Sequence, residues 1–474
     1  MQRRAKIICT IGPASRDTGT LRTLIDAGMD IARLNFSHGS HEEHAETIRR
    51  IRDAAEDRQR PIAILQDLQG PKIRTGSVPE DGVELRDGAR FTITTAEVET
   101  GSAERVHTSY TPLPGDVREG QTILLDDGYL SLEIEEIDGR DIHTRVLKGG
   151  TLHSNKGIIV PGASISAPPL STKDVEDLRF GLEAGVDAVA LSFVRSERDI
   201  IELRSTMKVF GRCVPIIAKI ERYEGISDIE DIINESDGIM VARGDLGVEM
   251  PAEEVPVLQK HIIQRCNFYG KPVITATQML ESMIQHPRPT RAEASDVANA
   301  VLDGTDCVML SAETSIGAYP TEAVSYMDRI VRAIEKEQLQ SLQVPREIPE
   351  DMQNNVSDAI GRASCVIAAQ IRAAAIVTLT TSGGTARVIA KYRPGTPILA
   401  LTDDAETCRQ LSFSWGVIPV LIPPLSEIDY QLAALRSHVL ASQLAARGDY
   451  VVYSAGSPLQ KRGSTNMLEV HRLS

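Results

Sequence analysis

Short runs of Ile, Val, Leu and Ala alternate along the chain with longer segments whose apolar residues recur every three or four positions. The short runs are typical of strands buried in a parallel sheet, and the longer period is that of amphipathic helices. Strands are predicted at 5–11, 31–36, 61–67, 186–193, 214–221, 237–243, 272–278 and 306–312. Helices are predicted after almost every strand, for example at 41–58, 196–210 and 320–338. Eight such units in succession predict an α/β fold of the (β/α)8 TIM-barrel type, assigned to 1–70 and 169–342.

One interval breaks this alternation. Between the third strand and the helix that begins near Ser171, short β-like segments are separated by Asp-Gly and Gly-Gly turns. These turns are typical of antiparallel hairpins. The β-like segments are 91–95, 122–125, 130–137 and 142–147. We therefore predict that 71–168 form a small β-barrel domain inserted after the third strand, with its two ends adjacent.

The C-terminal part of the chain alternates again after a polar, Pro-containing stretch at 343–355. Strands are predicted at 375–380, 397–401, 417–422 and 449–454, and helices at 356–373, 385–392, 404–413 and 427–446. This pattern predicts a separate open α/β domain over 343–474.

Composition and charge narrow the class of protein. The 474 residues are 42% hydrophobic and 25% charged, which is ordinary for a globular enzyme. The net charge of −15 argues against nucleic acid or an anionic membrane as a partner. No run of 18 apolar residues and no apolar leader is present, so neither a membrane span nor a signal peptide is expected. The six cysteines have no metal or redox spacing and are expected to be mostly buried thiols in the cytoplasm.

Polar side chains stand at the carboxyl ends of six predicted strands, where (β/α)8 enzymes hold their active sites. They are Arg33, Asn35, Ser37 and His38; Asp67, followed by Lys72 and Arg74; Lys219 and Glu221; Arg243, Gly244 and Asp245; Thr275, Thr277 and Gln278; and Ser311, Glu313 and Thr314. A single one of these would be explained as a helix cap or a surface ion pair. Six matched strand ends favour one shared site.

The residue types in this set suit phosphoryl chemistry. Glu221 and Asp245 are carboxylates at neighbouring strand ends, a donor set that suits Mg²⁺ or Mn²⁺. Arg33, Arg74 and Lys219 are cations that can surround a phosphoryl group and the charge that develops as it transfers.

Seven segments resemble the pyruvate kinase family, and the similarity covers very nearly the whole chain. They are Cys-Thr-Ile-Gly-Pro-Ala-Ser (9–15), Arg-Leu-Asn-Phe-Ser-His-Gly (33–39), Gly-Pro-Lys-Ile-Arg-Thr-Gly (70–76), Ile-Ala-Lys-Ile-Glu (217–221), Met-Val-Ala-Arg-Gly-Asp-Leu-Gly-Val-Glu (240–249), Ala-Thr-Gln-Met-Leu-Glu-Ser-Met (276–283) and Met-Leu-Ser-Ala-Glu-Thr (309–314). The resemblance implies transfer of a phosphoryl group from phosphoenolpyruvate to ADP, giving pyruvate and ATP as the last step of glycolysis. It also implies a homotetramer.

The resemblance implies a role for each matching position. Glu221 and Asp245 would hold the catalytic metal, Lys219 would stabilise the enolate of pyruvate, and Arg33 would bind the transferring phosphoryl group. The substrate carboxylate and the proton route to the enolate would involve Thr277, the backbone of Gly244 and Asp245, Ser311 and, more weakly, Glu313. Nucleotide contacts would come from Pro13, Asn35, His38, Arg74 and Lys173. The chain has neither a P-loop nor a Rossmann fingerprint, which agrees with a nucleotide held between barrel and insertion.

Two further clusters carry weaker predictions. His38, His41 and His44 have a spacing that a metal site would allow, but a solvated helix start is the preferred interpretation, except for His38. The C-terminal loop Thr380, Thr381, Ser382, Gly383, Gly384 and Thr385 joins a strand to a helix and suits a phosphate, although an ordinary capped turn is the alternative. The family resemblance favours a sugar phosphate or AMP as an activating effector there, with Lys461 and Arg462 as partners.

The turn after the third strand departs from the commonest family pattern. Many pyruvate kinases hold potassium near residues that match Asn35, Ser37 and Asp67, followed by a threonine and later a glutamate. Here the turn is Asp67-Leu68-Gln69-Gly70-Pro71-Lys72, so an apolar residue and an ammonium replace those two oxygens. We predict that Lys72 replaces potassium and that potassium is not required.

Two other functions remain open from the residues. A barrel lyase or aldolase acting on phosphoenolpyruvate or pyruvate would share the metal and enolate chemistry, but would leave the insertion, Arg74 and Lys173 without a purpose. A metabolite sensor would not need Lys219, Glu221, Asp245 and Thr277 together.

Overall fold

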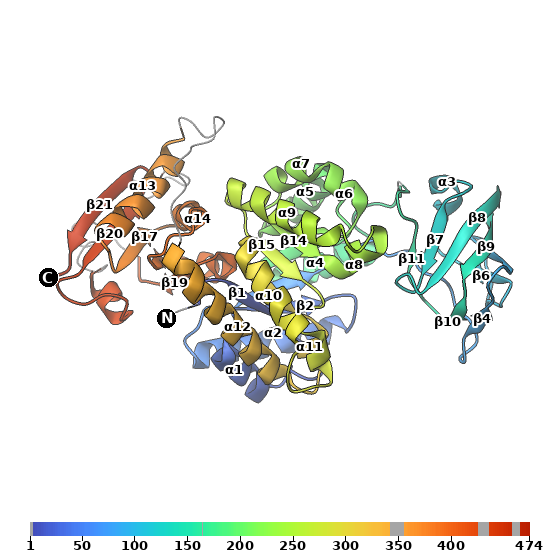
Figure 1. The fold of residues 1–474 in the computed structure, drawn as a ribbon, viewed down its shortest axis with the longest axis horizontal. Helices are drawn as coiled ribbons and strands as arrows, with labels where there is room; N and C mark the ends of the chain where they lie inside the picture. The colour runs from blue at the N-terminus through green and yellow to red at the C-terminus, as the bar shows by residue number, and fades with distance from the viewer. Residues whose placement is uncertain (1–2, 164, 342–354, 425–435, 457–464) are drawn as a thin grey trace.

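The computed structural model describes residues 3–163, 165–341, 355–424, 436–456 and 465–474. Three parts follow one another along the long axis of the molecule (Figure 1). The β-rich insertion lies at one end, the barrel in the middle and the C-terminal domain at the other end.

Eight parallel strands close into a barrel in the order β1-β16-β15-β14-β13-β12-β3-β2. They are β1 Lys6–Thr10, β2 Ile31–Asn35, β3 Ala63–Asp67, β12 Ala188–Leu191, β13 Ile216–Ile220, β14 Gly238–Ala242, β15 Val273–Ala276 and β16 Cys307–Leu310. Nearly every residue of these strands is buried, because side chains on one face fill the barrel and those on the other pack under helices. All eight predicted strands, and the (β/α)8 fold, are confirmed.

Helices surround the barrel. They are α1 Thr18–Ala27, α2 His41–Asp57, α4 Thr172–Ala184, α5 Glu197–Val209, α6 Tyr223–Ser227, α7 Ile229–Glu235, α8 Arg243–Glu249, α9 Val255–Tyr269, η1 Glu281–Ile284, α10 Arg291–Asp303, α11 Ala312–Ser315 and α12 Pro320–Ser341. Capping boxes fix the first turns of α2, α4 and α10. The capping box of α4 has a second role. The Asp174 carboxylate accepts from the amide of the N-cap residue Ser171, and it also accepts from the Gly70 amide at 3.0 Å. The two chain segments that lead into and out of the insertion are therefore fastened together.

The insertion is a small barrel. A six-stranded sheet has the order β11-β7-β8-β9-β5-β6, and a two-stranded sheet joins β10 to β4. The strands are β4 Val83–Leu85, β5 Arg90–Thr94, β6 Arg105–His107, β7 Thr122–Leu125, β8 Leu130–Asp138, β9 Asp141–Lys148, β10 Gly150–Leu152 and β11 Ile158–Ile159, with the short helix α3 Leu113–Asp116 between them. Residues 74 and 75 bridge to Gly157 beside β11 and to Thr108 beside β6, so the two edges of the large sheet are joined. The predicted β-like segments are strands β5, β7, β8 and β9.

The C-terminal domain has a five-stranded sheet of order β19-β18-β17-β20-β21. Its elements are α13 Val356–Gln370, β17 Ala375–Leu379, α14 Gly384–Lys391, β18 Ile398–Thr402, α15 Ala405–Gln410, η3 Leu411–Phe413, β19 Val417–Leu421, β20 Tyr450–Ala455 and β21 Met467–Arg472. The first four strands are parallel, as predicted, and β21 is an added antiparallel edge strand. Much of the predicted helix 427–446 lies outside the described residues.

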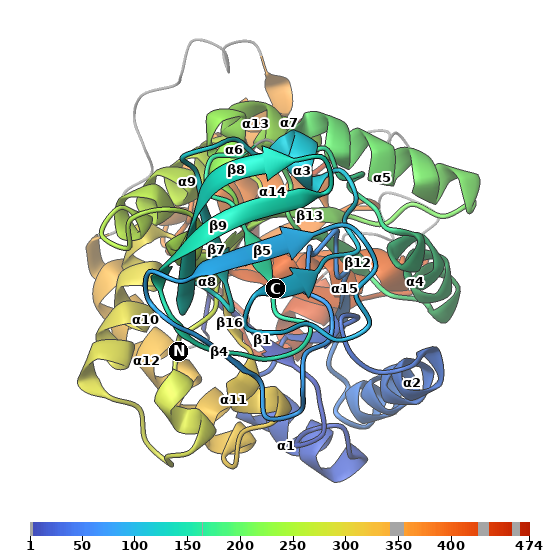
Figure 2. The ribbon, with the colours of Figure 1, turned by 90° about the vertical axis from the view of Figure 1, so that its right-hand side faces the viewer.

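The insertion and the C-terminal domain lie at opposite ends of the barrel. The insertion leaves the chain after the carboxyl end of β3, and a view along the long axis shows its strands in front of the barrel (Figure 2). The C-terminal domain instead contacts the amino ends of the strands. Lys6 donates to the Val417 carbonyl at 2.6 Å, Ser412 donates to the Pro61 carbonyl at 2.8 Å, and Arg409 pairs with Asp187 at 2.7 Å.

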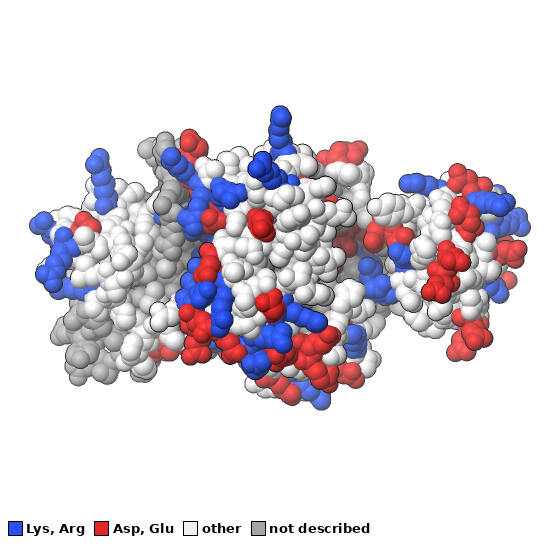
Figure 3. Space-filling model, turned by 90° about the horizontal axis from the view of Figure 1, so that it is seen from below, with Lys and Arg blue, Asp and Glu red and all other residues white. Residues whose placement is uncertain are grey.

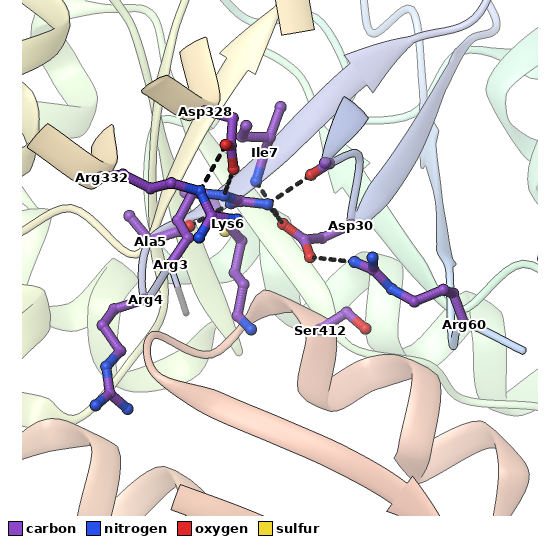
Figure 4. A network of polar contacts seen from close by, with 12 residues as sticks. Arg3, Arg4, Ala5, Lys6, Ile7, Asp30, Arg60, Asp328, Arg332 and Ser412 are labelled. Carbon is purple, nitrogen blue, oxygen red and sulfur yellow. Dashed lines mark hydrogen bonds and ion pairs between the residues drawn. The ribbon is translucent and has the colours of Figure 1, made fainter. Parts of the chain in front are cut away.

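A buried ion network fixes the first strand at that same end (Figure 4). The Arg3 guanidinium pairs with Asp30 at 2.7 Å and with Asp328 of α12 at 2.9 Å. Asp30 also accepts from the Ile7 amide at 2.9 Å, and Arg60 approaches it at 3.5 Å. Burial raises the pKa of Asp30, but the charges of Arg3 and Lys6 outweigh burial, so the pKa lies below its ordinary value.

The exposed surface carries both signs of charge. On the face seen from below, acidic and basic side chains are interspersed over the barrel and the insertion (Figure 3). Several of them form exposed pairs on neighbouring helices, such as Arg58 with Asp26 at 2.8 Å. Among the described residues, no helix combines the length and the apolar character that crossing a membrane requires. Five of the six cysteines are buried, and Cys213 is exposed.

Replacing Asp30 by alanine should destabilise the barrel, because a buried guanidinium loses one of its two carboxylates. The loss of a partner in a buried pair costs about 3–5 kcal/mol, so the midpoint of thermal unfolding should fall by at least ~5 °C. The exposed pair offers a matched control, because Asp26→Ala should cost less than ~1 kcal/mol.

The same variant has a pH signature. The pKa of Asp30 is lower in the folded protein than in the unfolded chain. The contribution of Asp30 to the free energy of unfolding is therefore fully present above the unfolded pKa of about 3.9, and it is lost as the pH falls through the lower pKa of the folded protein. Thermal unfolding of wild type and Asp30→Ala should differ most near neutral pH. A difference that stays constant down to pH ~3 would contradict this assignment.

Candidate active site

The ammonium of Lys219 lies at the carboxyl end of the barrel among acceptors from three strands. Its Nζ donates to Ser192 Oγ at 2.7 Å and lies 2.9 Å from Glu221 Oε1 and 3.2 Å from Asp67 Oδ1. Burial lowers the pKa of Lys219, but the charges of Asp67 and Glu221 outweigh it, and the pKa lies above its ordinary value. Lys219 is therefore a fixed, fully charged ammonium at neutral pH.

Arg33 is held on the opposite side of the same carboxylate. Its Nε pairs with Asp67 Oδ2 at 2.7 Å, and its Nη1 donates to Thr10 Oγ1 at 2.9 Å. Asp67 is 1% exposed and links two cations, Arg33 of the adjacent strand β2 and Lys219 of β13, which is separated from β3 by β12. Burial alone would raise its pKa, but Lys219 and Arg33 hold the pKa below its ordinary value. The predicted pair of cations is thus preassembled.

The predicted metal carboxylates lie close enough to affect each other. Burial, followed by the negative charge of Glu221, raises the pKa of Asp245 to about 6, against the opposing charges of Lys219 and Lys72. Glu221 is held by Lys219 and by the Phe193 amide at 2.8 Å, whereas the Asp245 carboxylate has no hydrogen-bond partner among the described residues. Asp245 thus lacks the direct cation partner that Asp67 and Glu221 have, although the charges of Lys219 and Lys72 act on it. Glu221 and Asp245 together offer the oxygen ligands that a divalent cation such as Mg²⁺ prefers.

Thr277 lies in a strained turn after β15. Thr277 and Gln278 both have positive φ, 67° and 53°. The Gly244 amide donates to Thr277 Oγ1 at 2.8 Å, and that hydroxyl donates to the Ala276 carbonyl at 2.7 Å. Side chains disfavour this backbone region by about 1–3 kcal/mol per residue, so surrounding contacts must hold it.

Arg243 supplies those contacts. Its guanidinium donates to the Thr277 carbonyl at 2.8 Å and reaches the carbonyls of Ala276 and Gln278 at 3.3 and 3.4 Å. Asp296 of α10 fixes the same guanidinium at 2.7 Å. Arg243 therefore positions the Thr277 turn against Gly244.

Ser311 and Glu313 meet at the end of β16. Glu313 is 2% exposed and accepts from the amides of Ser311 at 2.7 Å and Leu280 at 3.1 Å. Burial raises the pKa of Glu313, although these backbone donors oppose the shift. The carboxylate ties the end of β16 to the turn after β15, which is a positioning contact.

The predicted nucleotide residues fall into two groups. Lys173 donates to the Phe36 carbonyl at 2.7 Å and so reaches the end of β2, where the Asn35 side chain accepts from the Ser37 amide at 3.2 Å. His38 and Pro13 follow strands β2 and β1 on this rim. Arg74 instead belongs to the insertion, where its guanidinium donates to the Asn155 carbonyl at 2.9 Å. The structure therefore places the first group on the rim of the barrel and Arg74 in the insertion.

The other two histidines stack on aromatic rings. The His41 Nε2 is hydrogen-bonded to the Asp177 carboxylate at 2.7 Å. The His41 ring stacks on Phe180, with ring centroids 4.4 Å apart. His44 stacks on Phe36 at 4.0 Å and contacts the His38 carbonyl at 2.9 Å. Both rings are partly exposed, and the neighbouring Glu42 and Glu43 at this helix start are exposed, as a solvated helix start requires. Over the described residues, no three His, Cys, Asp or Glu side chains group as metal ligands.

The turn after β3 places its unusual residues differently. Leu68 is 1% exposed and packs in the barrel's main core, so its side chain offers no oxygen at the rim. The Lys72 side chain passes Gly157, with Cε 3.2 Å from where a Cβ would stand on that glycine. Burial and the charge of Glu221 raise the pKa of Asp245, and the positive charge of Lys72 is one of those that oppose this rise. Lys72 therefore faces the carboxylate end of the site.

Sequence reasoning missed two residues of this site, Ser192 and Phe193, and gave no role to a third, Arg243. Ser192 accepts from Lys219 and donates to the Leu68 carbonyl at 2.8 Å, and Phe193 has a positive φ of 57° that directs its amide to Glu221. Both follow β12, a strand end whose Ser-Phe-Val sequence gives no sign of a functional role. Arg243 was visible in a strand-end motif, but its role depends on a partner far along the chain, Asp296.

The fold and this rim define a class: a (β/α)8 enzyme with fixed cations and carboxylates suited to a metal and a phosphorylated substrate. A family model described as "Pyruvate kinase, barrel domain" matches residues 2–324, and "Pyruvate kinase, alpha/beta domain" matches residues 358–471. The pyruvate kinase of Geobacillus stearothermophilus is 47% identical over 100% of this chain and 81% of its own length. Pyruvate kinase 2 of Synechocystis is 48% identical over 99% and 79%.

Solved structures agree. The crystal structure of a pyruvate kinase from Cryptosporidium parvum covers 100% of this chain and 96% of its own, with a TM-score of 0.92 and 39% identity. The chain belongs to the pyruvate kinase family. Its activity is that of a phosphotransferase, and its substrates are phosphoenolpyruvate and ADP.

Replacing Arg243 by lysine should release the Thr277 turn, since one ammonium cannot bridge three carbonyls as a guanidinium does. We expect kcat/KM for phosphoenolpyruvate to fall by about 10- to 100-fold, while the thermal midpoint changes little. Steady-state kinetics with varied phosphoenolpyruvate measures this change. The control is Arg265→Lys at an exposed pair with Glu230, which should retain full activity. An unchanged kcat/KM in Arg243→Lys would refute the positioning role.

Proposed function

We propose that the rim of the barrel carries out the transfer through Lys219 and Arg33. The observation that supports this is the buried ammonium of Lys219, fixed by Ser192, Glu221 and Asp67. Arg33 binds the phosphoryl group. As the bond between phosphorus and the enol oxygen breaks, the phosphoryl group passes to the terminal phosphate of ADP. Lys219 stabilises the negative charge left on the enolate oxygen, where a preorganised cation is most effective.

Glu221 and Asp245 would hold Mg²⁺ or Mn²⁺. When bound, the divalent cation neutralises charge on substrate oxygens. The fit rests on two carboxylates at neighbouring strand ends, on the Asp245 carboxylate having no hydrogen-bond partner among the described residues, and on the raised pKa of Asp245, caused by burial and by Glu221.

The enolate must then take a proton at its methylene carbon to become pyruvate. Thr277 and the amides of Gly244 and Asp245 bind the substrate carboxylate, which orients that carbon. Ser311 lies beside the proton route, and Glu313 holds Ser311 and Leu280 in place. The buried Glu313 carboxylate is thus a positioning residue for the route.

The nucleotide would lie between the rim and the insertion. Pro13, Asn35, His38 and Lys173 would contact it from the barrel, and Arg74 from the insertion. Movement of 71–168 toward the barrel of 1–70 and 169–342 would bring these groups together and exclude water from the reacting phosphate. Asp174, which joins the two connecting segments, is a fixed point for such a hinge.

One assay distinguishes a pyruvate kinase from a lyase or aldolase and from a metabolite sensor. A coupled assay with phosphoenolpyruvate, ADP and Mg²⁺ should show pyruvate and ATP formed in equal amounts. A lyase or aldolase would form no ATP, and a sensor would form neither product.

Lys219→Met should lower turnover by roughly 10³-fold, because the ammonium meets charge that exists mainly in the transition state. Binding of Mn²⁺, measured by calorimetry, should largely persist because Glu221 and Asp245 remain. Lys208→Met, on the exposed face of α5, is the matched control and should be fully active. Turnover within tenfold of wild type would rule out the assignment.

Regulation is proposed for the C-terminal domain of 343–474. The loop of Thr380, Thr381, Ser382, Gly383, Gly384 and Thr385 precedes α14 and would bind the phosphate of a sugar phosphate or AMP. Thr381 is exposed, whereas Thr385 is 7% exposed and bonds to Thr465 at 2.7 Å, so the exposed hydroxyls at the start of the loop are the better ligands. Lys461 and Arg462 lie outside the described residues. A cytoplasmic homotetramer completes the proposal by family resemblance.

The enzyme is proposed to work without potassium. Asp67 already forms ion pairs with two cations, and Leu68 is buried in the core. Only Asn35 and Ser37 therefore remain as side-chain ligands of a monovalent ion. Lys72 supplies a permanent positive charge near Asp245, in the region where potassium would otherwise act.

Activity in tetramethylammonium buffer with Mg²⁺ should therefore equal activity in potassium chloride of the same ionic strength. The double variant Leu68→Thr, Lys72→Glu restores the two missing oxygens and should acquire a stimulation by potassium of at least ~10-fold. Initial rates of pyruvate formation measure both. A many-fold stimulation of the wild type by potassium would overturn the proposal.

A further inference from the structure

A cavity of about 330 Å³ lies between the barrel and the C-terminal domain, at the end opposite the active site. On the barrel side it is lined by residues next to the amino ends of β13, β14 and β15, among them Pro215, Asp237 and Lys271. On the other side it is lined by one face of α14 and by Phe413. Its volume is within the range of sites for small metabolites.

Helix α14 divides its residues between two surfaces. Ala386, Ile389 and Ala390 pack in the core of the C-terminal domain. Gly384, Arg387, Val388 and Lys391 recur at the spacing of a single helix face and line the cavity. The cavity face therefore carries the two cations of the helix, and the core face carries none.

Both carboxylates in the cavity wall are already neutralised. Asp237 pairs with Arg204 at 3.1 Å and accepts from the Ile216 amide at 3.0 Å. Asp358 pairs with Lys391 at 2.8 Å and accepts from the Tyr392 hydroxyl. The charge of Asp237 also acts on Lys271 and Arg387, whose pKa values it raises against the effect of burial, but neither cation lies within ion-pair distance of that carboxylate.

Two cations in the wall lack such a partner. Across the described part of the chain, neither Lys271 nor Arg387 has a carboxylate within ion-pair distance. Their hydrogen bonds go to backbone carbonyls, of Asn234 and Ser236 for Lys271 and of Ser382 for Arg387. Burial lowers the pKa of both groups, and the charge of Arg387 contributes to the lowering at Lys271. Two like charges thus lie near each other beside a cavity. An anion placed between them would relieve both the burial and the repulsion.

We propose that this cavity binds the phosphate group of a small phosphorylated metabolite, with Arg387 and Lys271 as its ligands. A phosphate monoester carries nearly two negative charges and so balances both cations, whereas a monocarboxylate balances one. Arg387 offers a planar fork to two phosphate oxygens, and Lys271 adds a point charge from the barrel. Val388, Phe413 and Ile217 leave apolar wall for the rest of the ligand. Such a ligand connects α14 to the bottom of the barrel.

This site borders the proposed effector loop, with which it shares Gly384, but its ligands are not the loop hydroxyls. The loop hydroxyls precede α14, and Thr385 turns toward Thr465 rather than toward the cavity. Lys271 belongs to the barrel and takes no part in the loop. The two proposals can therefore fail separately.

Trp415 provides a local readout. It is the only tryptophan in the chain, follows Phe413 and Ser414 of the cavity wall, and lies under the Arg393 guanidinium at 5.0 Å. Titration of the full-length protein with glycerol 3-phosphate should change its fluorescence, and glycerol should not. Calorimetry gives the dissociation constant, and glycerate tests whether a carboxylate suffices.

Four variants test the proposal: two in the cavity wall, one at an exposed control position and one in the effector loop. Arg387→Gln and Lys271→Met should each raise the dissociation constant by ~10-fold or more, whereas Arg447→Gln, an exposed cation of the same domain, should not. Thr381→Glu, which places a negative charge at an exposed residue of the effector loop, should leave the Trp415 response intact. Binding that is lost in Thr381→Glu but unchanged in Lys271→Met would assign the ligand to the loop and overturn the proposal. No fluorescence change and no binding heat up to ~10 mM, or glycerate binding as tightly as glycerol 3-phosphate, would also overturn it.

Discussion

Closure of the barrel is the constraint on which the rest of the structure depends. The first strand pairs with the last, so that Ile8 lies opposite Met309, and with the second, so that Ile8 lies opposite Ile31. Because all the strands run in parallel, closure gathers eight carboxyl ends on one rim and eight amino ends on the other. The rim of carboxyl ends holds Lys219, Arg33 and the carboxylates, and the insertion stands over it. The other rim is covered by the C-terminal domain, whose Phe413 belongs to the apolar cluster inside the barrel.

The sequence was sufficient for the parts of the fold that depend on local pattern. Buried parallel strands are apolar on both faces, so each appears as a short run, and all eight were found. Polar residues after such runs were expected on one rim, and Lys219, Glu221, Asp67 and Arg33 do meet there. The edge strand β21 was missed because its residues are mostly half-buried or exposed and its pattern is weak. The joining of the insertion's sheet edges through residues 74 and 75 depends on bridges to Gly157 and Thr108, which no local pattern reveals.

Pairing within the site was equally invisible in the sequence. Asp67 appeared as a ligand for a monovalent ion, yet in the folded chain it is the common partner of Arg33 and Lys219. Such a partnership is set by the register of adjacent strands: Arg33 lies opposite Leu65, two residues before Asp67 on the same face. The two rims of the barrel also differ in whether their cations have carboxylate partners. At the catalytic rim, Arg33 and Lys219 lie within ion-pair distance of carboxylates, whereas Lys271 and Arg387 in the cavity at the other rim have no carboxylate at that distance among the described residues.

Among the described residues of the barrel, three of the four non-glycine residues with positive φ lie at the same rim as the charges, and the fourth is Gln59. Phe193 and the pair Thr277–Gln278 are non-glycine residues with positive φ, and each follows directly on a barrel strand or one residue later. Their conformations are held from outside the turn, by Glu221 for the Phe193 amide and by Arg243 for the carbonyls around Thr277. A flexible loop would relax away from such conformations, but strands fixed by hydrogen bonds on both sides cannot follow. The closed barrel therefore sustains local strain, and the strained turns direct an amide and a hydroxyl toward positions that relaxed backbone would not reach.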